Sequence, residues 1–346
     1  MNELFNKILK IAGKNEVYIV GGWLRDKILH KENRDLDIIT LANPISIAKK
    51  IARGLNGRLV ILDTENKIYR VVLKNDKRLD YIDISKMKGS NILADLKNRD
   101  FTINSFAVPL EKEIRISEII DPFKGLSDLK GKKIRLTSAH ALADDPLRML
   151  RAYRMASELK FKIVPETIKQ IKKYAPKIKQ SAWERIREEL FKILSSEDSL
   201  NKIEELEISG LLDRLFPEID EMKRSGRKFY YHPKGLWQHS TETLRSLENI
   251  INNLDELFNK NGEKVRNHLN EPLSSGITRL NLLKIVSLFH DIAKPSTAKR
   301  VGDRMRFFGH ESKGAQKVSE VLKRLRLGAS DIKIAKTLVE HHMRPI

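Results

Sequence analysis

Two acidic residues, Asp35 and Asp37, are the strongest candidates for chemistry in this sequence. They lie in Arg34-Asp-Leu-Asp-Ile-Ile-Thr40, a segment that predicts a strand, and residues two apart in a strand point to the same face. Two adjacent carboxylates repel each other unless a divalent cation lies between them, and Mg²⁺ prefers such ligands together with substrate phosphates. Metal ions held there would activate an attacking 3′-hydroxyl and neutralise a departing pyrophosphate. A solvated strand edge is the alternative explanation.

A glycine-rich turn precedes this pair. In Val17-Tyr-Ile-Val-Gly-Gly-Trp-Leu-Arg-Asp26 a buried strand leads through Gly21 and Gly22 into a helix. The backbone N–H groups of such a turn can approach a triphosphate closely, and Arg25 would reach a phosphate from one helical turn further on. An ordinary strand-to-helix turn would have the same pattern.

A third acid is predicted at Asp83. The alternation in Leu79-Asp-Tyr-Ile-Asp-Ile84 places Tyr81 and Asp83 on one face of a strand and Asp80 on the other. An edge-strand aspartate that faces water would fit nearly as well.

A later segment, Asp144-Asp-Pro-Leu-Arg-Met-Leu-Arg-Ala-Tyr-Arg154, places one acid and three arginines along a predicted helix. Asp145, Arg148 and Arg151 recur at helical spacing, with Arg154 close behind. A carboxylate and a guanidinium on a rigid helix can imitate the hydrogen-bonding edge of a template base. A salt-bridged helix face is the alternative.

Most histidines lie in the C-terminal third of the sequence. His239, His290-Asp291, His310 and His341-His342 fall on predicted helices. Neutral imidazoles with one aspartate can hold a transition metal or Mg²⁺ that activates water for phosphoester hydrolysis. We assign His239, His290 and Asp291 as the candidate metal ligands.

The elements that position these residues fall into two kinds. Up to about residue 127 we expect helices at residues 2–12, 24–29 and 45–55, and strands at residues 17–20, 36–40, 59–63, 68–73 and 81–84. After Leu126 we expect no strands, and helices at residues 146–159, 166–174, 183–194 and 200–208. A turn-rich stretch at residues 223–234 precedes the histidine-rich region, which carries a polar insertion near residues 259–275. We therefore predict three domains, at residues 1–127, 128–225 and 226–346.

Composition favours a folded chain with a polyanionic partner. The 346 residues carry 66 Lys and Arg against 46 Asp and Glu, a net charge of +20 spread through several basic runs. A generic basic surface is the alternative. The sequence contains no cysteine, which excludes disulfides and zinc–thiolate sites, and it has no apolar run of membrane-spanning length. We expect a cytoplasmic protein without membrane association, and the sequence does not determine its oligomeric state.

Gly21-Gly-Trp-Leu-Arg-Asp26 followed by Asp35-Leu-Asp37 resembles the head of the class II tRNA nucleotidyltransferase and bacterial poly(A) polymerase family. Asp95-Leu-Lys-Asn-Arg-Asp-Phe-Thr-Ile-Asn-Ser105 is similar to a further family segment, which implies that Arg99 contacts the ribose or phosphates of the incoming nucleotide. Asn98 stands where the family has another arginine. The resemblance spans roughly residues 15 to 220, and Asp121-Pro-Phe-Lys-Gly-Leu-Ser-Asp-Leu129 marks the join between head and body.

The resemblance also assigns roles in the body. It implies that Asp145 and Arg148 select the nucleotide and that Arg151 and Arg154 bind phosphates, with Asp144 in place of the family's leading glutamate. Ala182-Trp-Glu-Arg-Ile-Arg-Glu-Glu-Leu190 is similar to a motif that braces this site, in which Arg185 would be structural.

The histidine-rich region resembles the HD phosphohydrolase motif through Leu288-Phe-His-Asp-Ile-Ala-Lys-Pro295. HD proteins take a further Asp ligand downstream of the position of His341-His342. No such Asp occurs before Ile346, which predicts either a longer natural chain or an incomplete metal site. An HD-like fold with a purely RNA-supporting role is the alternative to hydrolysis.

We therefore predict an α/β nucleotidyltransferase head, an all-α neck and body, and an α-helical HD-like tail. The predicted activity is Mg²⁺-dependent transfer of CMP from CTP to a tRNA 3′ end. Only about nine residues separate Ser85 from Asp95, whereas CCA-adding relatives have a longer loop there, so we favour CC addition over full CCA addition with ATP.

Three rival functions stay open. A poly(A) polymerase would use ATP only, and an HD phosphohydrolase would act on cyclic nucleotides or RNA ends. A non-catalytic RNA-binding protein would leave the paired carboxylates unexplained.

Overall fold

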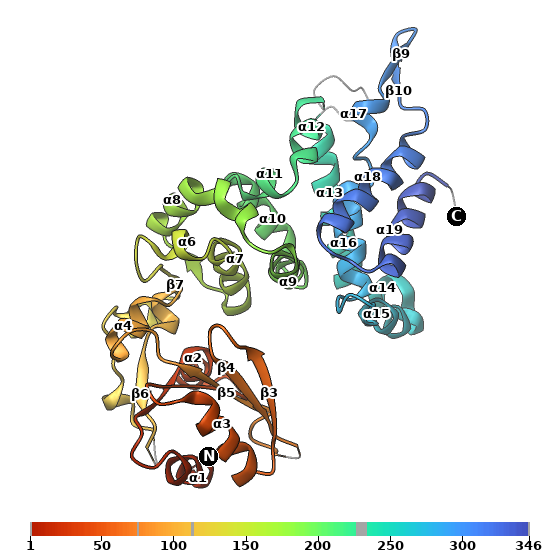
Figure 1. Ribbon diagram of the computed structural model, residues 1–346. Helices are drawn as coiled ribbons and strands as arrows, with labels where there is room; N and C mark the ends of the chain where they lie inside the picture. The colour runs from red at the N-terminus through yellow and green to blue at the C-terminus, as the bar shows by residue number, and fades with distance from the viewer. Residues whose placement is uncertain (1, 75, 112–113, 226–233, 345–346) are drawn as a thin grey trace. The chain divides into compact units, whose positions relative to one another are not determined.

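The structure is a computed structural model that describes residues 2–74, 76–111, 114–225 and 234–344 (Figure 1). It divides into two compact units, one of Met1–Asp144 with Phe161–Thr167 and one of Asp145–Lys160 with Ile168–Ile346. The finer division into three domains stays a prediction. Most of the turn-rich stretch expected at residues 223–234 lies outside the described residues.

The first unit is built on one mixed six-stranded sheet with the order β3-β4-β5-β2-β1-β6. The central pair, β2 and β5, is parallel, and the other neighbours are antiparallel. The strands are β1 (Val17–Val20), β2 (Asp35–Thr40), β3 (Arg58–Asp63), β4 (Ile68–Val72), β5 (Tyr81–Lys86) and β6 (Ala107–Pro109). The five expected strands are confirmed, and β6 was not predicted.

The expectation of no strands after Leu126 is wrong. β7 (Lys133–Ile134) pairs in parallel with β8 (Lys162–Ile163), and β9 (Lys299–Val301) forms an antiparallel hairpin with β10 (Arg304–Arg306). Strands of two or three residues are too short to show the period-2 alternation by which strands are recognised.

Short helices of the first unit fix the loops near β2. Its helices are α1 (Asn2–Ala12), α2 (Gly21–Ile28), α3 (Pro44–Gly54), α4 (Ile92–Lys97), α5 (Gly125–Lys130) and α6 (Ala141–Asp144), with 3₁₀ turns at Thr102–Asn104 and Ile116–Glu118. Val20, Ile39, Met87, Leu96 and Ala107 form one buried cluster. Because this cluster joins the ends of β1 and β2 to α4, it fixes the residues that follow α4 beside the sheet.

The segment around Asp121 closes the head. Its carboxylate accepts hydrogen bonds from the backbone N–H groups of Gly125 (2.7 Å) and Leu126 (2.9 Å) at the start of α5. A Cβ at Gly125 would lie 2.1 Å from the carbonyl oxygen of Thr102. Glycine is therefore required for α5 to pack against the Thr102 turn.

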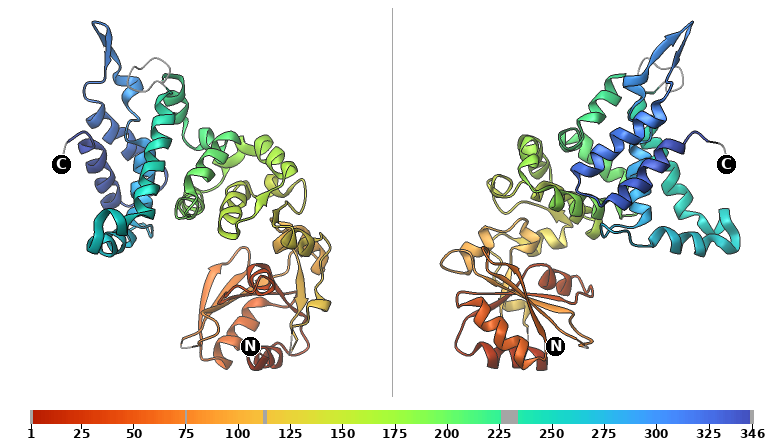
Figure 2. Two further views of the ribbon diagram at one scale, coloured as in Figure 1. Left: turned by 180° about the vertical axis from the view of Figure 1, so that it is seen from behind. Right: turned by 45° about the vertical axis from the view of Figure 1, so that its right-hand side comes forward.

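Where the structure describes it, the second unit is helical apart from the β9–β10 hairpin and its connecting turns (Figures 1 and 2). Its helices are α7 (Arg148–Leu159), α8 (Pro165–Tyr174, which begins in the first unit), α9 (Trp183–Leu194), α10 (Ser199–Ile208), α11 (Leu211–Leu215), α12 (Pro217–Ser225), α13 (Leu236–Asn252), α14 (Leu254–Phe258), α15 (Gly262–Asn270), α16 (Arg279–Phe289), α17 (Lys294–Thr297), α18 (His310–Arg324) and α19 (Ala329–His341). In the described residues, no helix is long and apolar enough to span a bilayer.

A buried lysine joins the body to the HD-like region within this unit. Lys284 of α16 is 4% exposed, and its Nζ donates to the carbonyl oxygens of Leu194 (2.9 Å) and Ser196 (3.0 Å) at the end of α9. Glu248 of α13 lies 3.3 Å from the same nitrogen. The lysine thus supplies donors to helix carbonyls that have no partner within α9.

Candidate functional site

Asp35 and Asp37 lie on one face of β2, as the sequence predicts. Leu36 and Ile38 between and beyond them are buried in the core, while both aspartates are partly exposed. The parallel register places Asp37 directly opposite Asp83 of β5. The fold therefore gathers three carboxylates at the centre of the sheet.

Asp83 has a firm partner. Arg70 of β4, which is its register neighbour, donates to both carboxylate oxygens at 2.7 Å, and its guanidinium lies 3.9 Å from the centroid of the Tyr81 ring. Such a bidentate pair neutralises the third acid. The sequence analysis did not name Arg70, because its role depends on the register between β4 and β5.

The electrostatics of the site favour protonation of Asp37. Burial raises its pKa to about 6, and the carboxylates of Asp83 and Asp35 add to the rise. Arg99 and the backbone N–H of Gly22 oppose it. Burial also raises the pKa of Asp35, against a hydrogen bond from Tyr81. A bound divalent cation would relieve this repulsion, and the two carboxylates with substrate phosphates form the ligand set that suits Mg²⁺.

The glycine turn touches the acidic pair. Gly21 has a φ of 72°, and a Cβ there would lie 2.8 Å from Asp37 Oδ2 and 3.5 Å from Arg99 Nη1. Only a residue without a side chain lets the backbone approach the carboxylate so closely. Arg99 is oriented by Asp95, which accepts from its Nε at 3.1 Å. Gly21, Asp37 and Arg99, predicted from three separate motifs, therefore meet at one point.

Arg25 is held beside Gly22 by two partners. It donates through Nε (2.7 Å) and Nη2 (2.9 Å) to Asp26, and through Nη1 to Asn104 Oδ1 at 2.8 Å. A Cβ at Gly22 would lie 3.6 Å from Arg25 Nη2. Asn104 was quoted in the Asp95–Ser105 motif but not predicted as a site residue. Its hydrogen bond with Arg25 indicates that Asn104 orients this arginine.

The predicted nucleotide-selecting residues lie in the second unit, at the start of α7. One oxygen of Asp145 accepts from the backbone N–H of Leu147 (3.2 Å), and the other accepts from Arg185 of α9 (2.9 Å). Arg148 is the first residue of α7. The structural role expected for Arg185 thus has a defined partner, and nucleotide selection by Asp145 and Arg148 stays a prediction.

The two arginines further along α7 face a buried glutamate. Glu189 of α9 accepts from Arg154 Nε at 2.6 Å and lies 4.0 Å from Arg151 Nη1. Arg154 also donates to Glu158 at 2.7 Å. The pairing joins α7 to α9, and phosphate binding by Arg151 and Arg154 stays a prediction.

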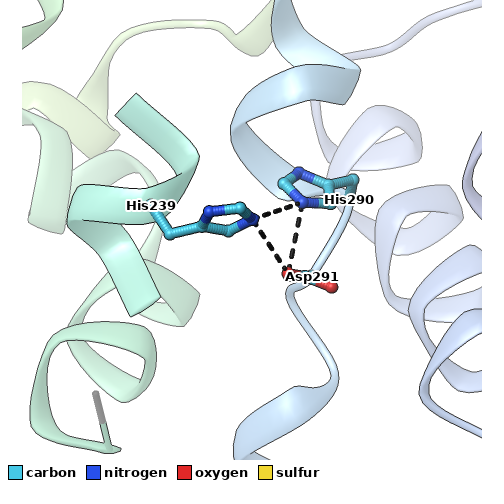
Figure 3. Close-up of side chains that lie close together, drawn as sticks. All are labelled: His239, His290 and Asp291. Atoms are coloured by element: carbon cyan, nitrogen blue, oxygen red, sulfur yellow. Dashed lines mark hydrogen bonds and ion pairs between the residues drawn. The ribbon is translucent and has the colours of Figure 1, made fainter. Parts of the chain in front are cut away.

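The histidine-rich region converges on Asp291. His239 from α13 and His290 at the end of α16 approach each other through their Nε2 atoms at 3.2 Å, and Asp291 Oδ2 lies 3.4 Å and 3.2 Å from them (Figure 3). Lys294 Nζ lies 2.7 Å from the same oxygen. The surrounding imidazoles hold the pKa of Asp291 well below its usual range, although burial alone would raise it.

Two more histidines complete this cluster. The Nε2 atoms of His310 and His342 lie 3.6 Å and 3.4 Å from Asp291 Oδ1, so Asp291 is shared by two groups of potential metal ligands. The sequence analysis noted both histidines but did not assign them as ligands. Their convergence depends on the packing of α18 against α19, which spacing along the chain does not reveal.

The ring orientations suit metal ligation. The Nδ1 atoms of His290, His310 and His342 lie 2.8, 2.7 and 2.6 Å from the carbonyl oxygens of Ser287, Phe307 and Val339, and a carbonyl can only accept. Each Nδ1 therefore carries the proton, which leaves Nε2 as the free electron pair. The Nε2 atoms of His310 and His342 are buried and make no hydrogen bond within the described part of the chain. These residues fit a divalent metal.

The sequence matches three families in order along the chain. Residues 17–135 match the Poly A polymerase head domain, residues 160–223 the family described as "Probable RNA and SrmB- binding site of polymerase A", and residues 236–346 the HD domain.

Among curated proteins, the A-adding tRNA nucleotidyltransferase of Deinococcus radiodurans is 31% identical over 94% of this chain and 68% of its own length. The CC-adding tRNA nucleotidyltransferase of Geobacter sulfurreducens is 31% identical over 81% of this chain and 60% of its own length. Among solved structures, a CCA-adding enzyme in complex with CTP has a TM-score of 0.68 at 25% identity and covers 98% of this chain and 70% of its own. The Thermotoga maritima CCA-adding enzyme complexed with tRNA has a TM-score of 0.64 at 25% identity, over 98% of this chain and 78% of its own.

The fold of the head and the paired aspartates on β2 define the class of RNA nucleotidyltransferases. More narrowly, this chain belongs to the tRNA nucleotidyltransferase family, with an HD domain at its C-terminal end.

The histidine cluster predicts metal uptake that depends on Asp291. After chelation and incubation with Mn²⁺, Ni²⁺ or Zn²⁺, we expect the full chain to retain metal and to unfold at a higher temperature, because an ion that binds only the folded state stabilises it. Asp291→Asn should lose both effects, measured by elemental analysis and thermal unfolding. His268→Gln, which changes an exposed histidine outside the cluster, should behave as the wild type. Equal metal content in Asp291→Asn would contradict the site.

Proposed function

We propose that this chain transfers CMP from CTP to the 3′ end of tRNA without a nucleic-acid template and releases pyrophosphate. The observation that carries the proposal is the meeting of Asp37, Gly21 and Arg99 in a nucleotidyltransferase head. The chain spans 68% and 60% of the two curated relatives described above, one of them named A-adding and the other CC-adding.

The paired carboxylates supply the catalytic centre of this proposal. Asp35 and Asp37 would hold Mg²⁺, which activates the tRNA 3′-hydroxyl and neutralises the departing pyrophosphate. Raised pKa values at both residues mark a site that needs a cation, since the free carboxylates repel each other. Asp83 completes the acidic face from β5, and Arg70 keeps it oriented.

The residues around the carboxylates would bind the triphosphate. Gly21 and Gly22 begin α2, where the helix dipole favours an anion. Arg25 and Arg99 add guanidinium groups whose positions are fixed by Asn104 and Asp95. Guanidinium groups fixed in this way would orient the triphosphate for attack at its α-phosphate.

Nucleotide choice is proposed to rest with Asp145 and Arg148. Their carboxylate and guanidinium can pair with the hydrogen-bonding edge of a base, as a template base would. Asp145 is preoriented by Arg185 and by the backbone of Leu147. Further along α7, Arg151 and Arg154 would contribute positive charge toward phosphates, while Glu189 holds both side chains in place.

A short connection supports addition of two cytidines. Residues 87–91 link β5 to α4, and Asn91 caps α4 by accepting from the N–H of Ala94 at 2.9 Å. This connection is shorter than the loop that the family resemblance leads us to expect in a CCA-adding enzyme. We therefore propose CC addition.

A second activity is favoured by the cluster around Asp291. Four imidazoles and one carboxylate form a ligand set suited to a transition metal, and such a metal would supply activated water for phosphoester hydrolysis. Lys294, 2.7 Å from Asp291, would contribute a positive charge beside the developing anion.

Asp37→Asn tests whether the residue needed for nucleotide addition also lowers the stability of the fold. Because the pKa of Asp37 is raised in the folded state, the charged carboxylate destabilises the fold above about pH 6 and costs little near pH 4. Without metal, we expect Asp37→Asn to raise the free energy of unfolding by about 1–2 kcal/mol at pH 8 and by much less at pH 4.5. We also expect it to abolish nucleotide addition. Denaturant unfolding at both pH values tests this, and a destabilised variant at pH 8 would contradict it.

Gly21→Ala tests the close approach of the turn to Asp37. The added Cβ would lie 2.8 Å from Asp37 Oδ2 and would push that oxygen away. A displacement of about 1 Å at a catalytic group can lower the rate about 100-fold. Gly13→Ala is the matched control, because Gly13 has a φ of 63° but no atom within 4 Å of its Cβ position. Both variants should lose similar stability, whereas only Gly21→Ala should lose nucleotide addition. Equal rates of nucleotide addition in the two variants would contradict the role given to the close approach of Gly21 to Asp37.

The specificity is tested with tRNA transcripts that end at the discriminator base, at C or at CC, supplied with Mg²⁺ and CTP, ATP or both. We expect growth by two cytidines that then stops. A further residue with ATP would show a full CCA enzyme, and growth of the CC-ended tRNA alone would show an A-adding one. Growth with ATP on unrelated RNAs would show a poly(A) polymerase.

A further inference from the structure

The β9–β10 hairpin is a strongly basic element that the proposed activities do not use. It contains Lys299, Arg300, Arg304 and Arg306, all exposed, against a single acidic residue, Asp303, at its turn. No ion pair links these four cations to any carboxylate in the described residues. The hairpin extends from one end of the HD domain, whereas α14 and α15 lie at the other end (Figures 1 and 2).

The register gathers the charges on one face. Lys299 pairs with Arg306 and Val301 with Arg304, so these four side chains share a face, while Arg300 and Met305 share the other. Cations two residues apart along a strand are about 6.6 Å apart. The first face therefore carries three cations, with Arg304 and Arg306 along one strand and Lys299 opposite Arg306, beside one exposed aliphatic side chain, Val301.

An exposed aromatic residue follows directly. Phe308 is 71% exposed, whereas its neighbour Phe307 packs against the ring of His310 with centroids 6.5 Å apart. Phenylalanine side chains are usually buried in folded proteins, so the exposure of the Phe308 ring calls for an explanation. A cationic face next to an exposed aromatic ring is the combination by which proteins follow the backbone of a single strand and stack a base.

We propose that the β9–β10 hairpin with Phe308 is a docking surface for single-stranded or loop RNA. Arg304 and Arg306 contact neighbouring phosphates, Lys299 adds charge beside Arg306, and Phe308 stacks on a base. An acidic protein would satisfy the cations but gives no reason for the exposed ring. The inference deepens the proposed function, on which its choice of RNA as the partner rests.

The test compares two double charge reversals in the full chain. Arg304→Glu with Arg306→Glu changes the hairpin, and Lys260→Glu with Lys264→Glu makes the same change in charge on exposed residues of the α14–α15 end. Fluorescence anisotropy with a labelled tRNA transcript and with a single-stranded oligoribonucleotide measures affinity across a salt series. We expect the hairpin variant to bind both about tenfold more weakly and with a salt dependence reduced by about one to two charges. The control should stay within about twofold of the wild type.

Phe308→Ala probes the stacking contact separately. We expect weaker binding of the oligoribonucleotide with an unchanged salt dependence, because no phosphate contact is lost. Equal affinities of the hairpin and control variants for both RNAs would overturn the docking surface, provided that all variants unfold at the wild-type temperature. A hairpin variant that loses tRNA binding no more than the control, while wild-type protein extends tRNA, refutes only this inference. If the wild-type protein binds RNA but does not extend it, and the hairpin variant binds RNA more weakly than the control, only the proposed function is refuted.

Discussion

Repulsion between neighbouring carboxylates is the constraint on which the head is organised. The parallel pairing of β2 with β5 brings Asp35, Asp37 and Asp83 together, and a folded chain pays electrostatically for that arrangement. Arg70 neutralises one acid, and Arg99 with the Gly22 N–H partly offsets another. The remaining imbalance is what a divalent cation and its bound triphosphate would correct, so the site is unstable by itself and suited to its substrate.

The HD domain has the opposite arrangement, with one carboxylate among many nitrogen groups. A single buried carboxylate, Asp291, is surrounded by four imidazoles and the ammonium group of Lys294, so that nitrogen groups outnumber the acid. Backbone carbonyls fix three of the rings with Nε2 directed inward. The head thus concentrates oxygen ligands that suit Mg²⁺, whereas the tail concentrates nitrogen ligands that suit a softer metal.

Local patterns predicted the parts of the molecule that depend on neighbours in the chain. Alternation placed Asp35 and Asp37 on one face of β2, and the motif of Arg99 contains a residue that lies near Asp37, while its nucleotide contact stays a prediction. Contacts between distant segments were missed. Arg70 meets Asp83 only through strand register, and His310 and His342 meet Asp291 only through helix packing. The β9–β10 hairpin was missed because its strands have three residues each.

The sequence predicts a boundary between the body and the HD-like region, and buried contacts within the second unit cross it. Lys284 closes the end of α9 from α16 and is paired with Glu248, so helices from both sides of the expected boundary share one buried cation. An HD domain exchanged from a relative without this lysine would leave the carbonyl oxygens of Leu194 and Ser196 unpaired in the interior. Replacing the domain would therefore require a matching change at the end of α9, so the two regions could not be exchanged independently.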